Sequence, residues 1–184
     1  TNGQQSGGGG VAALDANLLI LNSHLDKNET VGESPGGGLM SESTTVEILR
    51  SAITGNQTLH STAGGGGILL VSGSGALVNS TVSGNASAGS ESFGGGVLAD
   101  NAQVQITNST ITENRSGGGG GGVAAMGPQT AALQTGALTL DNAIIAANLG
   151  SAQSPDLFVS LRDSDQLVVR FSLVGDQLGT RSEE

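Results

Sequence analysis

The chain has no cysteine, no tryptophan and no tyrosine, and only three of its 184 residues are phenylalanine. Without cysteine it forms no disulfide and no thiolate metal site. A globular core rarely lacks large aromatic side chains, whereas a narrow interior filled by Val, Ile, Leu and Ala does not need them. The composition therefore favours a thin and regular core.

Positive charge and long apolar runs are also scarce. Six Lys and Arg stand against 16 Asp and Glu, which gives a net charge of −10 and a pI of about 4.3. Nucleic-acid binding needs a basic footprint, so we expect no nucleic-acid partner. No apolar run approaches the roughly 18 residues of a membrane span, so we expect no direct membrane insertion by this segment. No signal peptide is visible, since Thr1 starts in mid-pattern, and we expect a mature product or a fragment.

Glycine, by contrast, is abundant, and it marks a repeat of about 28–29 residues. Each glycine tract leads directly into an aliphatic residue, which we number position 0 of the repeat. These residues are Val11, Leu39, Ile68, Val97 and Val123. An asparagine follows at position +17 in the first four repeats and eight residues later in the fifth: Asn28, Asn56, Asn85, Asn114 and Asn148. A fixed period of this size is typical of a solenoid.

The other aliphatic positions predict strands. Positions +7 and +9 alternate, and position +9 holds Ile20, Ile48, Leu77, Ile106 and Leu140 once the eight-residue insertion is skipped. Position +12 holds small residues and position +14 aliphatic ones. The inward-facing positions thus change from odd to even numbers, so the chain must bend near +11. The sequence therefore predicts three short strands per repeat, each repeat being one coil of a parallel β-helix. Equivalent residues then stack into columns, with +9 as an interior aliphatic ladder and +17 as an asparagine ladder at a left-handed corner.

The glycine tracts have two interpretations. Glycine-rich sequence is often a flexible linker. A linker has no reason to recur in register with an aliphatic ladder, so we expect the tracts to form a corner and the start of a strand, where backbones approach closely or take positive φ.

The last part of the chain departs from the repeat. We divide the chain into β-helix coils over residues 1–149, with repeats starting near 7, 36, 64, 94 and 120 and an insertion at 129–136, and an atypical last coil or cap over residues 150–184. Leu167, Val169, Ser172 and Val174 fit positions +7, +9, +12 and +14 of a sixth coil that lacks a glycine tract.

The repeat resembles the right-handed parallel β-helix of bacterial surface and secreted proteins of the autotransporter-passenger or adhesin-like type. The resemblance rests on GGGGILLVSGSGALVNSTVSGN (64–85), GGGVLADNAQVQITNSTITEN (94–114) and the ending NAIIAANLGSAQSPDL (142–157) with SLVGD (172–176). It covers nearly the whole chain. It implies an all-β, right-handed parallel β-helix of five to six coils and an extracellular or bacterial cell-surface location.

No reactive constellation stands out. Asp15 and Asp100 lie at positions +4 and +3 but three coils apart, where a hydrolase needs paired carboxylates. His24 and His60 are not at metal spacing, and Asp163 with Asp165 is a lone D-x-D that a surface turn explains. Six N-x-S/T sequons follow from a repeat written in Asn, Ser and Thr. We therefore predict no catalytic residues, no cofactor and no metal site.

Three functions remain open on the sequence. The first is a non-catalytic structural or adhesive module that binds itself or other surface proteins and assembles into filaments or arrays through a flat glycine side or its ends. The second is a carbohydrate-binding or polysaccharide-processing β-helix with glycans as partners, which the fold alone supports. The third is an accessory subunit of a larger surface complex.

Overall fold

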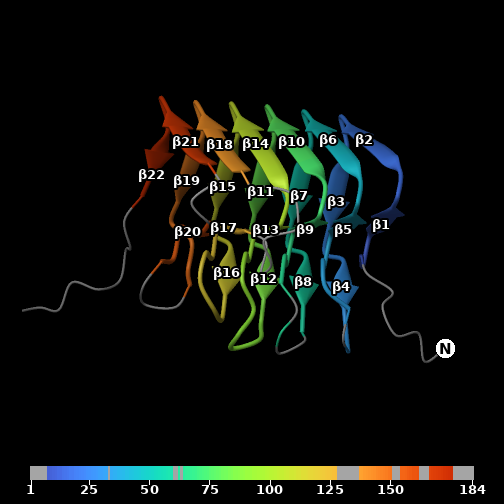
Figure 1. The fold of residues 1–184 in the computed structure, drawn as a ribbon. Helices are drawn as coiled ribbons and strands as arrows, with labels where there is room; N and C mark the ends of the chain where they lie inside the picture. Colours follow the sequence, from blue (N-terminus) through green and yellow to red (C-terminus); the bar gives the residue numbers. More distant parts are fainter. Residues whose placement is uncertain are drawn as a thin grey trace, which may run out of the picture.

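The computed structural model describes residues 8–32, 34–59, 62, 64–127, 137–150, 154–161 and 166–175. Within these ranges the protein contains strands and turns but no helix, and the strands stack into a parallel β-solenoid of about five turns with a spacing of about 29 residues. Figure 1 shows successive coils side by side, from the N-terminal coil with β1 to the C-terminal coil with β20, β21 and β22.

Two six-stranded parallel sheets carry positions 0 to +3 and +6 to +10. The first sheet contains β1 (Val11–Leu14), β5 (Leu39–Glu42), β9 (Ile68–Val71), β13 (Val97–Asp100), β17 (Val123–Met126) and β20 (Leu157–Ser160). The second sheet contains β2 (Asn17–Leu21), β6 (Thr45–Leu49), β10 (Ser74–Val78), β14 (Gln103–Thr107), β18 (Ala137–Asp141) and β21 (Gln166–Arg170).

A third sheet contributes to all six coils and a fourth sheet to the first four. The third sheet contains β3 (His24–Asp26), β7 (Ala52–Thr54), β11 (Thr81–Ser83), β15 (Thr110–Thr112), β19 (Ile144–Ala146) and β22 (Leu173–Val174). The fourth contains β4 (Glu29–Thr30), β8 (Gln57–Thr58), β12 (Ala86–Ser87) and β16 (Arg115–Ser116).

The strand register follows the repeat positions. Position +9 pairs with position +9 of the next coil throughout, as in Ile20 with Ile48 and Leu77 with Ile106. The last coil keeps this register, with Leu167 beside Leu138 and Val169 beside Leu140. The predicted all-β parallel β-helix is therefore confirmed. The insertion at 129–136 lies outside the described residues.

The expectation of three strands per coil was wrong, because the first four coils have a fourth. It is only two residues long and follows the asparagine at positions +18 and +19, as Glu29–Thr30 does in the first coil. Its residues are polar or small and too few to show alternation, so no hydrophobic period marks it.

Left-handed residues recur at four fixed positions of the first five coils, −3, +4, +11 and +16, although the fifth coil lacks one at +4. The last coil has one at +11 but none at −3 or +4. The bend expected near +11 lies at one of these four positions. The non-glycine members have φ between 47° and 60°: Asp15, Ser43, Ser72 and Asn101 at +4; Asn22, Arg50, Asn79, Asn108, Asn142 and Phe171 at +11; and Lys27, Glu113 and Ala147 at +16. The asparagines at +17 are not among them, so the left-handed corner lies one residue earlier than expected.

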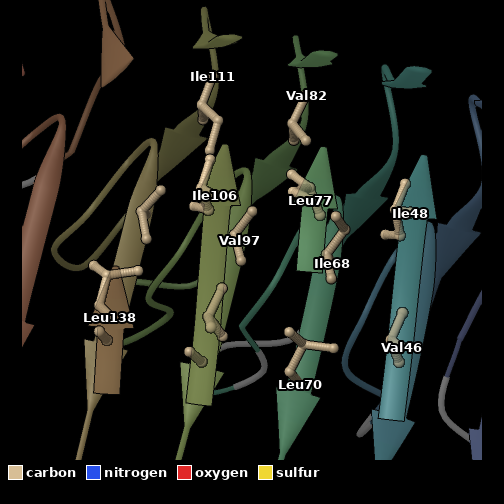
Figure 2. Packing of buried hydrophobic residues seen from close by; sticks show 14 of the residues in the cluster. Val46, Ile48, Ile68, Leu70, Leu77, Val82, Val97, Ile106, Ile111 and Leu138 are labelled. Atoms are coloured by element: carbon tan, nitrogen blue, oxygen red, sulfur yellow. The ribbon is translucent and has the colours of Figure 1, made fainter. Parts of the chain in front are cut away.

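The interior is one continuous aliphatic core formed by the inward faces of the first three sheets. Val46 and Ile48, Ile68 and Leu70, and Leu77 and Val82 point into the space between the strands (Figure 2). Ile48, Leu77, Ile106 and Leu140 of the predicted interior ladder are at most 1% exposed, and Ile20 in the first coil is 6% exposed. Because each coil covers the next, the core has no single centre and extends along the stack.

In one coil, a large side chain on the first sheet faces a glycine on the second sheet across this core. Position +2 is Ala13, Ser41, Ala99 or Ala125 in the other coils with a glycine tract and Val159 in the last coil, but in the third coil it is Leu70. Opposite, position +7 is Gly75, where a Cβ atom would lie 2.4 Å from Leu70 Cδ1. The large residue on the first sheet is thus accommodated by a glycine on the second.

This pairing predicts strong coupling between the two positions. Gly75→Val should lower the free energy of unfolding by about 1–3 kcal/mol through overpacking. Leu70→Ala should also destabilise, because it leaves a cavity. The double variant recreates the Ala99 and Val104 pair of the next coil and should be more stable than the sum of the single changes predicts. Urea unfolding of the four proteins measures this coupling, and additive effects would contradict it.

Candidate functional site

The asparagines at +17 form a hydrogen-bonded chain along the interior. The backbone N–H and the side-chain Nδ2 of Asn28 both donate to Oδ1 of Asn56, at 2.9 and 2.8 Å. The same pair of bonds links Asn56 to Asn85, Asn85 to Asn114 and Asn114 to Asn148. The amides of the last four asparagines also donate to the carbonyl oxygen at +14 of the preceding coil. Asn56, Asn85 and Asn114 are fully buried.

The glycine tracts pack closely against this ladder and against the backbone of the next coil, where a Cβ on Gly38 would lie 2.6 Å from the carbonyl oxygen of Gly67. At position −1, a Cβ on Gly38, Gly67 or Gly96 would lie 2.9–3.0 Å from the Cγ of its own coil's asparagine. At position −2, a Cβ on Gly37 would lie 2.5 Å from the carbonyl oxygen of Gln57. Gly36–Gly38, Gly64–Gly67 and Gly94–Gly96 are buried. The expectation of a flat outer glycine side is therefore wrong, because these glycines pack against the backbone and the amides of the interior.

A second polar column runs at position +12. Each serine hydroxyl donates to the carbonyl oxygen two residues earlier in its own coil. From the second coil on, its oxygen also accepts the N–H of the previous coil's +12 residue, as Ser51 does from Ser23 at 3.0 Å. Ser80 and Ser109 continue the column. Ala143 interrupts it, and Ser172 accepts again from the N–H of Ala143.

Asp156 ends the asparagine chain. Its Oδ1 accepts both the N–H and the Nδ2 of Asn148, at 2.9 and 2.8 Å, as the next asparagine would. Asp156 lies at position −1 of the last coil, where the earlier coils have glycine, and it is 2% exposed. Its Oδ2 is buried without a hydrogen-bond partner. The repeat pattern does not predict this role for Asp156, because the residue lies outside the +17 column.

A polar groove of about 470 Å³ crosses the outer face of the second sheet. Short side chains such as Ser74, Ala76 and Ala137 form its hollow, and longer side chains border it. The remaining outward residues that line it are Thr45, Glu47, Gln103, Gln105, Thr139 and Arg170. A second groove at the corner between the first and second sheets shares Thr45, Ser74 and Gln103 with it and adds Ser43 and Ser72. Together they form one surface that combines hydroxyl, amide and apolar groups with the charges of Glu47 and Arg170.

The described residues that line this surface include few ionisable groups. Its lining contains one carboxylate, Glu47, and one cation, Arg170. Glycoside hydrolysis in most enzymes uses two carboxylates on either side of the scissile bond. Hydroxyls and amides, by contrast, donate and accept hydrogen bonds to neutral polar groups. Among the described residues that line the groove, Glu47 is the one carboxylate.

A small charged cluster lies on the outer face of the third sheet at its N-terminal edge. Thr54 Oγ1 donates to Asp26 Oδ1 at 2.6 Å and lies 2.6 Å from His24 Nε2. The hydrogen bond from Thr54 lowers the pKa of Asp26, with smaller contributions from Lys27 and His24. Pairing of β3 with β7 explains the contact, because it brings position +15 of both coils together. Since the threonine donates to the carboxylate, its hydroxyl is not activated by the histidine.

The other candidate acids are not brought together. Asp15 occupies an exposed corner of the first coil, whereas Asp100 lies on the outer face of the first sheet with β5 and β9 between them. Burial raises the pKa of Asp100. His60, Asp163 and Asp165 lie outside the described residues. Across the residues that the structure describes, no group of three His, Cys, Asp or Glu could hold a metal ion.

The sequons divide into two sets. The asparagines of the sequons at Asn56, Asn85 and Asn114 are buried within the asparagine ladder, and Asn28 is half-buried at the start of that ladder. Those at Asn79 and Asn108 are exposed at the +11 corner. The described ranges contain no helix long and apolar enough to cross a membrane.

Comparison with known proteins adds no relative: no family model, no curated protein and no solved structure matches the chain.

The ladder makes Asn85 sensitive to substitution. Asn85→Leu should lower the free energy of unfolding by about 3 kcal/mol or more, because it leaves several buried groups of Asn56 and Ile53 without partners at about 1–3 kcal/mol each. Gln105→Leu on the exposed outer face is the control and should change stability by less than about 0.5 kcal/mol. Chemical unfolding measures both. Equal effects would show that the amide ladder contributes little.

The raised pKa of Asp100 predicts that the free energy of unfolding depends on pH. A carboxyl whose pKa is raised in the folded state binds more protons there than in the unfolded chain, so its contribution to stability falls as the pH rises from the unfolded to the folded pKa. Asp100→Asn should therefore gain stability over the parent as the pH is raised through this window, and the difference should level off above it. Urea midpoints between about pH 3 and pH 8 measure it. A difference independent of pH would contradict the effect of burial.

Proposed function

We propose that this protein is a non-catalytic structural or adhesive module of a bacterial cell-surface or extracellular protein. The observation that carries the proposal is that its buried polar side chains form hydrogen bonds between neighbouring coils. The amides of Asn28, Asn56, Asn85 and Asn114 and the serines at +12 bond from coil to coil and hold the stack rigid. In a rigid stack, the outward-facing side chains of successive coils lie at a fixed spacing along the molecule.

The outer surface supports adhesion more than catalysis. On the second sheet it presents short hydroxyl, amide and methyl side chains in columns, with a single carboxylate in the groove. The partners of such a module are other surface proteins or further copies of the chain, met along its faces or at its ends.

The polar groove favours a second candidate, carbohydrate binding. Ser74, Thr45, Gln103 and Gln105 present hydrogen-bonding groups at successive coils, spaced about 4.8 Å apart, and could follow an extended polar polymer. Aromatic platforms for sugar stacking are not part of the lining.

Labelling and a polysaccharide panel test the proposal together. Antibodies against the protein should label intact producing cells as strongly as permeabilised ones, with a cytoplasmic protein as the control. Acidic and neutral polysaccharides should gain no new chain ends on incubation with the protein. Labelling that needs permeabilisation, or cleavage of a polysaccharide, would overturn the proposal. Binding without cleavage that is lost in Gln103→Ala and Gln105→Ala would favour the carbohydrate-binding candidate.

A further inference from the structure

Two of the six N-x-S/T sequons lie on the outside of the coil, whereas the other four begin at asparagines of the interior ladder. Asn79 and Asn108 occupy position +11, at the corner between the second and third sheets, and both are exposed. We propose that these two asparagines are attachment sites for asparagine-linked glycans. This inference rests on the proposed function, because the N-x-S/T sequon is a glycosylation acceptor in secreted proteins.

The place of each sequon in the coil decides which of its residues face out. At the outer pair, the asparagine and the threonine two residues later (Thr81 or Thr110) lie on the outer surface, and the serine between them is buried. In the sequons that begin at Asn56, Asn85 and Asn114, the asparagine and the hydroxyl residue are instead both buried. An enzyme that reads the asparagine together with the hydroxyl at the third residue therefore has access to the outer pair in the folded chain.

The atom that would carry the sugar is free at both outer asparagines. Asn108 uses only its Oδ1, which accepts from Nδ2 of Asn142 at 2.7 Å. Within the described residues, Nδ2 of Asn79 and Nδ2 of Asn108 donate no hydrogen bond. A sugar on Nδ2 therefore displaces no contact of the folded chain at this corner.

The ladder asparagines have no such freedom. Nδ2 of Asn85 donates to the carbonyl oxygen of Ile53 at 2.9 Å and to Oδ1 of Asn114 at 2.8 Å. Nδ2 of Asn28, where the ladder starts, donates to Oδ1 of Asn56 at 2.8 Å. A sugar on any of these nitrogens would remove a hydrogen bond between coils and would have to lie within the packed interior. The fold thus separates two compatible sequons from four incompatible ones.

The coil geometry accounts for asparagine at position +11 but not for threonine at position +13. The φ angle is 50° at Asn79 and 48° at Asn108, a conformation that asparagine tolerates. Position +13 varies freely among His24, Ala52, Thr81, Thr110, Ile144 and Leu173. Threonine stands there in two coils, and both coils carry asparagine at +11. These two sequons are therefore not dictated by the requirements of the coil.

The neighbouring surface suits a sugar. Beside the corner, the outward residues of β11 and β15 are short and carry hydroxyl groups: Thr81, Ser83, Thr110 and Thr112. Hydroxyl groups both donate and accept hydrogen bonds, as sugar hydroxyls do. The chain supplies only the acceptor amide. Its Nδ2 displaces the phosphate from the anomeric carbon of a nucleotide-linked or lipid-linked sugar, the C–O bond breaks as the C–N bond forms, and the amide loses one proton to the transferase of the producing cell.

Mass spectrometry of the full chain purified from its producing cells tests the inference. We expect added mass in units of hexose or N-acetylhexosamine, assigned by fragmentation of the glycopeptides to Asn79 and Asn108. Asn79→Gln and Asn108→Gln should each leave a glycan at the other site, and the double variant should carry none. Thr81→Ala combined with Thr110→Ala keeps both asparagines and should also carry none, whereas the two threonine-to-serine changes should retain the glycans.

The next coil offers a matched gain of modification. Asn142 lies at the same corner, is exposed and has φ of 50°, but Ile144 stands at position +13. Asn142 should therefore be unmodified in the parent, and Ile144→Thr should add a glycan to it. Position +13 faces outward, so we expect urea midpoints close to that of the parent for the threonine and isoleucine variants, which separates loss or gain of the glycan from loss of the fold.

Three outcomes would overturn the inference: peptides with Asn79 and Asn108 that are wholly unmodified in the parent, glycans on the ladder asparagines of the folded chain, or glycans that persist when both threonines are replaced by alanine. An unmodified chain that antibodies label on intact cells would end this inference and leave the surface proposal standing. A glycosylated chain that is labelled only after permeabilisation would do the reverse.

Discussion

A single carbonyl oxygen that accepts two hydrogen bonds is the interaction on which the rest of the structure depends. Oδ1 at position +17 receives both the backbone N–H and the side-chain Nδ2 of the coil before it. These groups are buried in an aliphatic interior, where an unpaired amide is costly and a paired one is strongly directional. The ladder therefore fixes the register of neighbouring coils with a specificity that Val, Ile and Leu alone do not supply.

The glycines, the fourth strand and the left-handed corners at +16 and −3 surround this amide in each of the first four coils. The asparagine lies directly against position −1, and the strand after it lies against position −2, so neither position has room for a Cβ atom. The chain must also turn sharply to enter this layer and leave it, which the positive φ values at +16 and −3 accomplish. The conformational cost of consecutive glycines is thus tied to a particular contact.

Most of the strand pairing could be predicted from the sequence, whereas features that do not recur with the 28–29-residue period could not. The columns at 0, +7, +9 and +14 predict strand pairing because alternate residues of a strand share a face, and Ile20 indeed pairs with Ile48. The two-residue strand at Glu29–Thr30 is too short to alternate. The role of Asp156 could not be predicted, because it lies at position −1 while its side chain takes the place of the asparagine at +17. Leu70 and Gly75 compensate across the interior, which no one-dimensional pattern displays, and the depth of the groove depends on the relative lengths of side chains on adjacent coils.

The coil does not vary in length evenly around its perimeter. The distance from Asn28 to Leu39 is 11 residues, from Asn56 to Ile68 it is 12, and from Asn114 to Val123 it is 9. The other change in length comes between the first and second strands, after Met126 and again after Ser160, before β18 and β21 resume the earlier register. Length is therefore free at two corners and constant elsewhere. Since β18 and β21 keep the register of β14 across connections of different length, segments can lengthen at these two corners without disturbing the ladder.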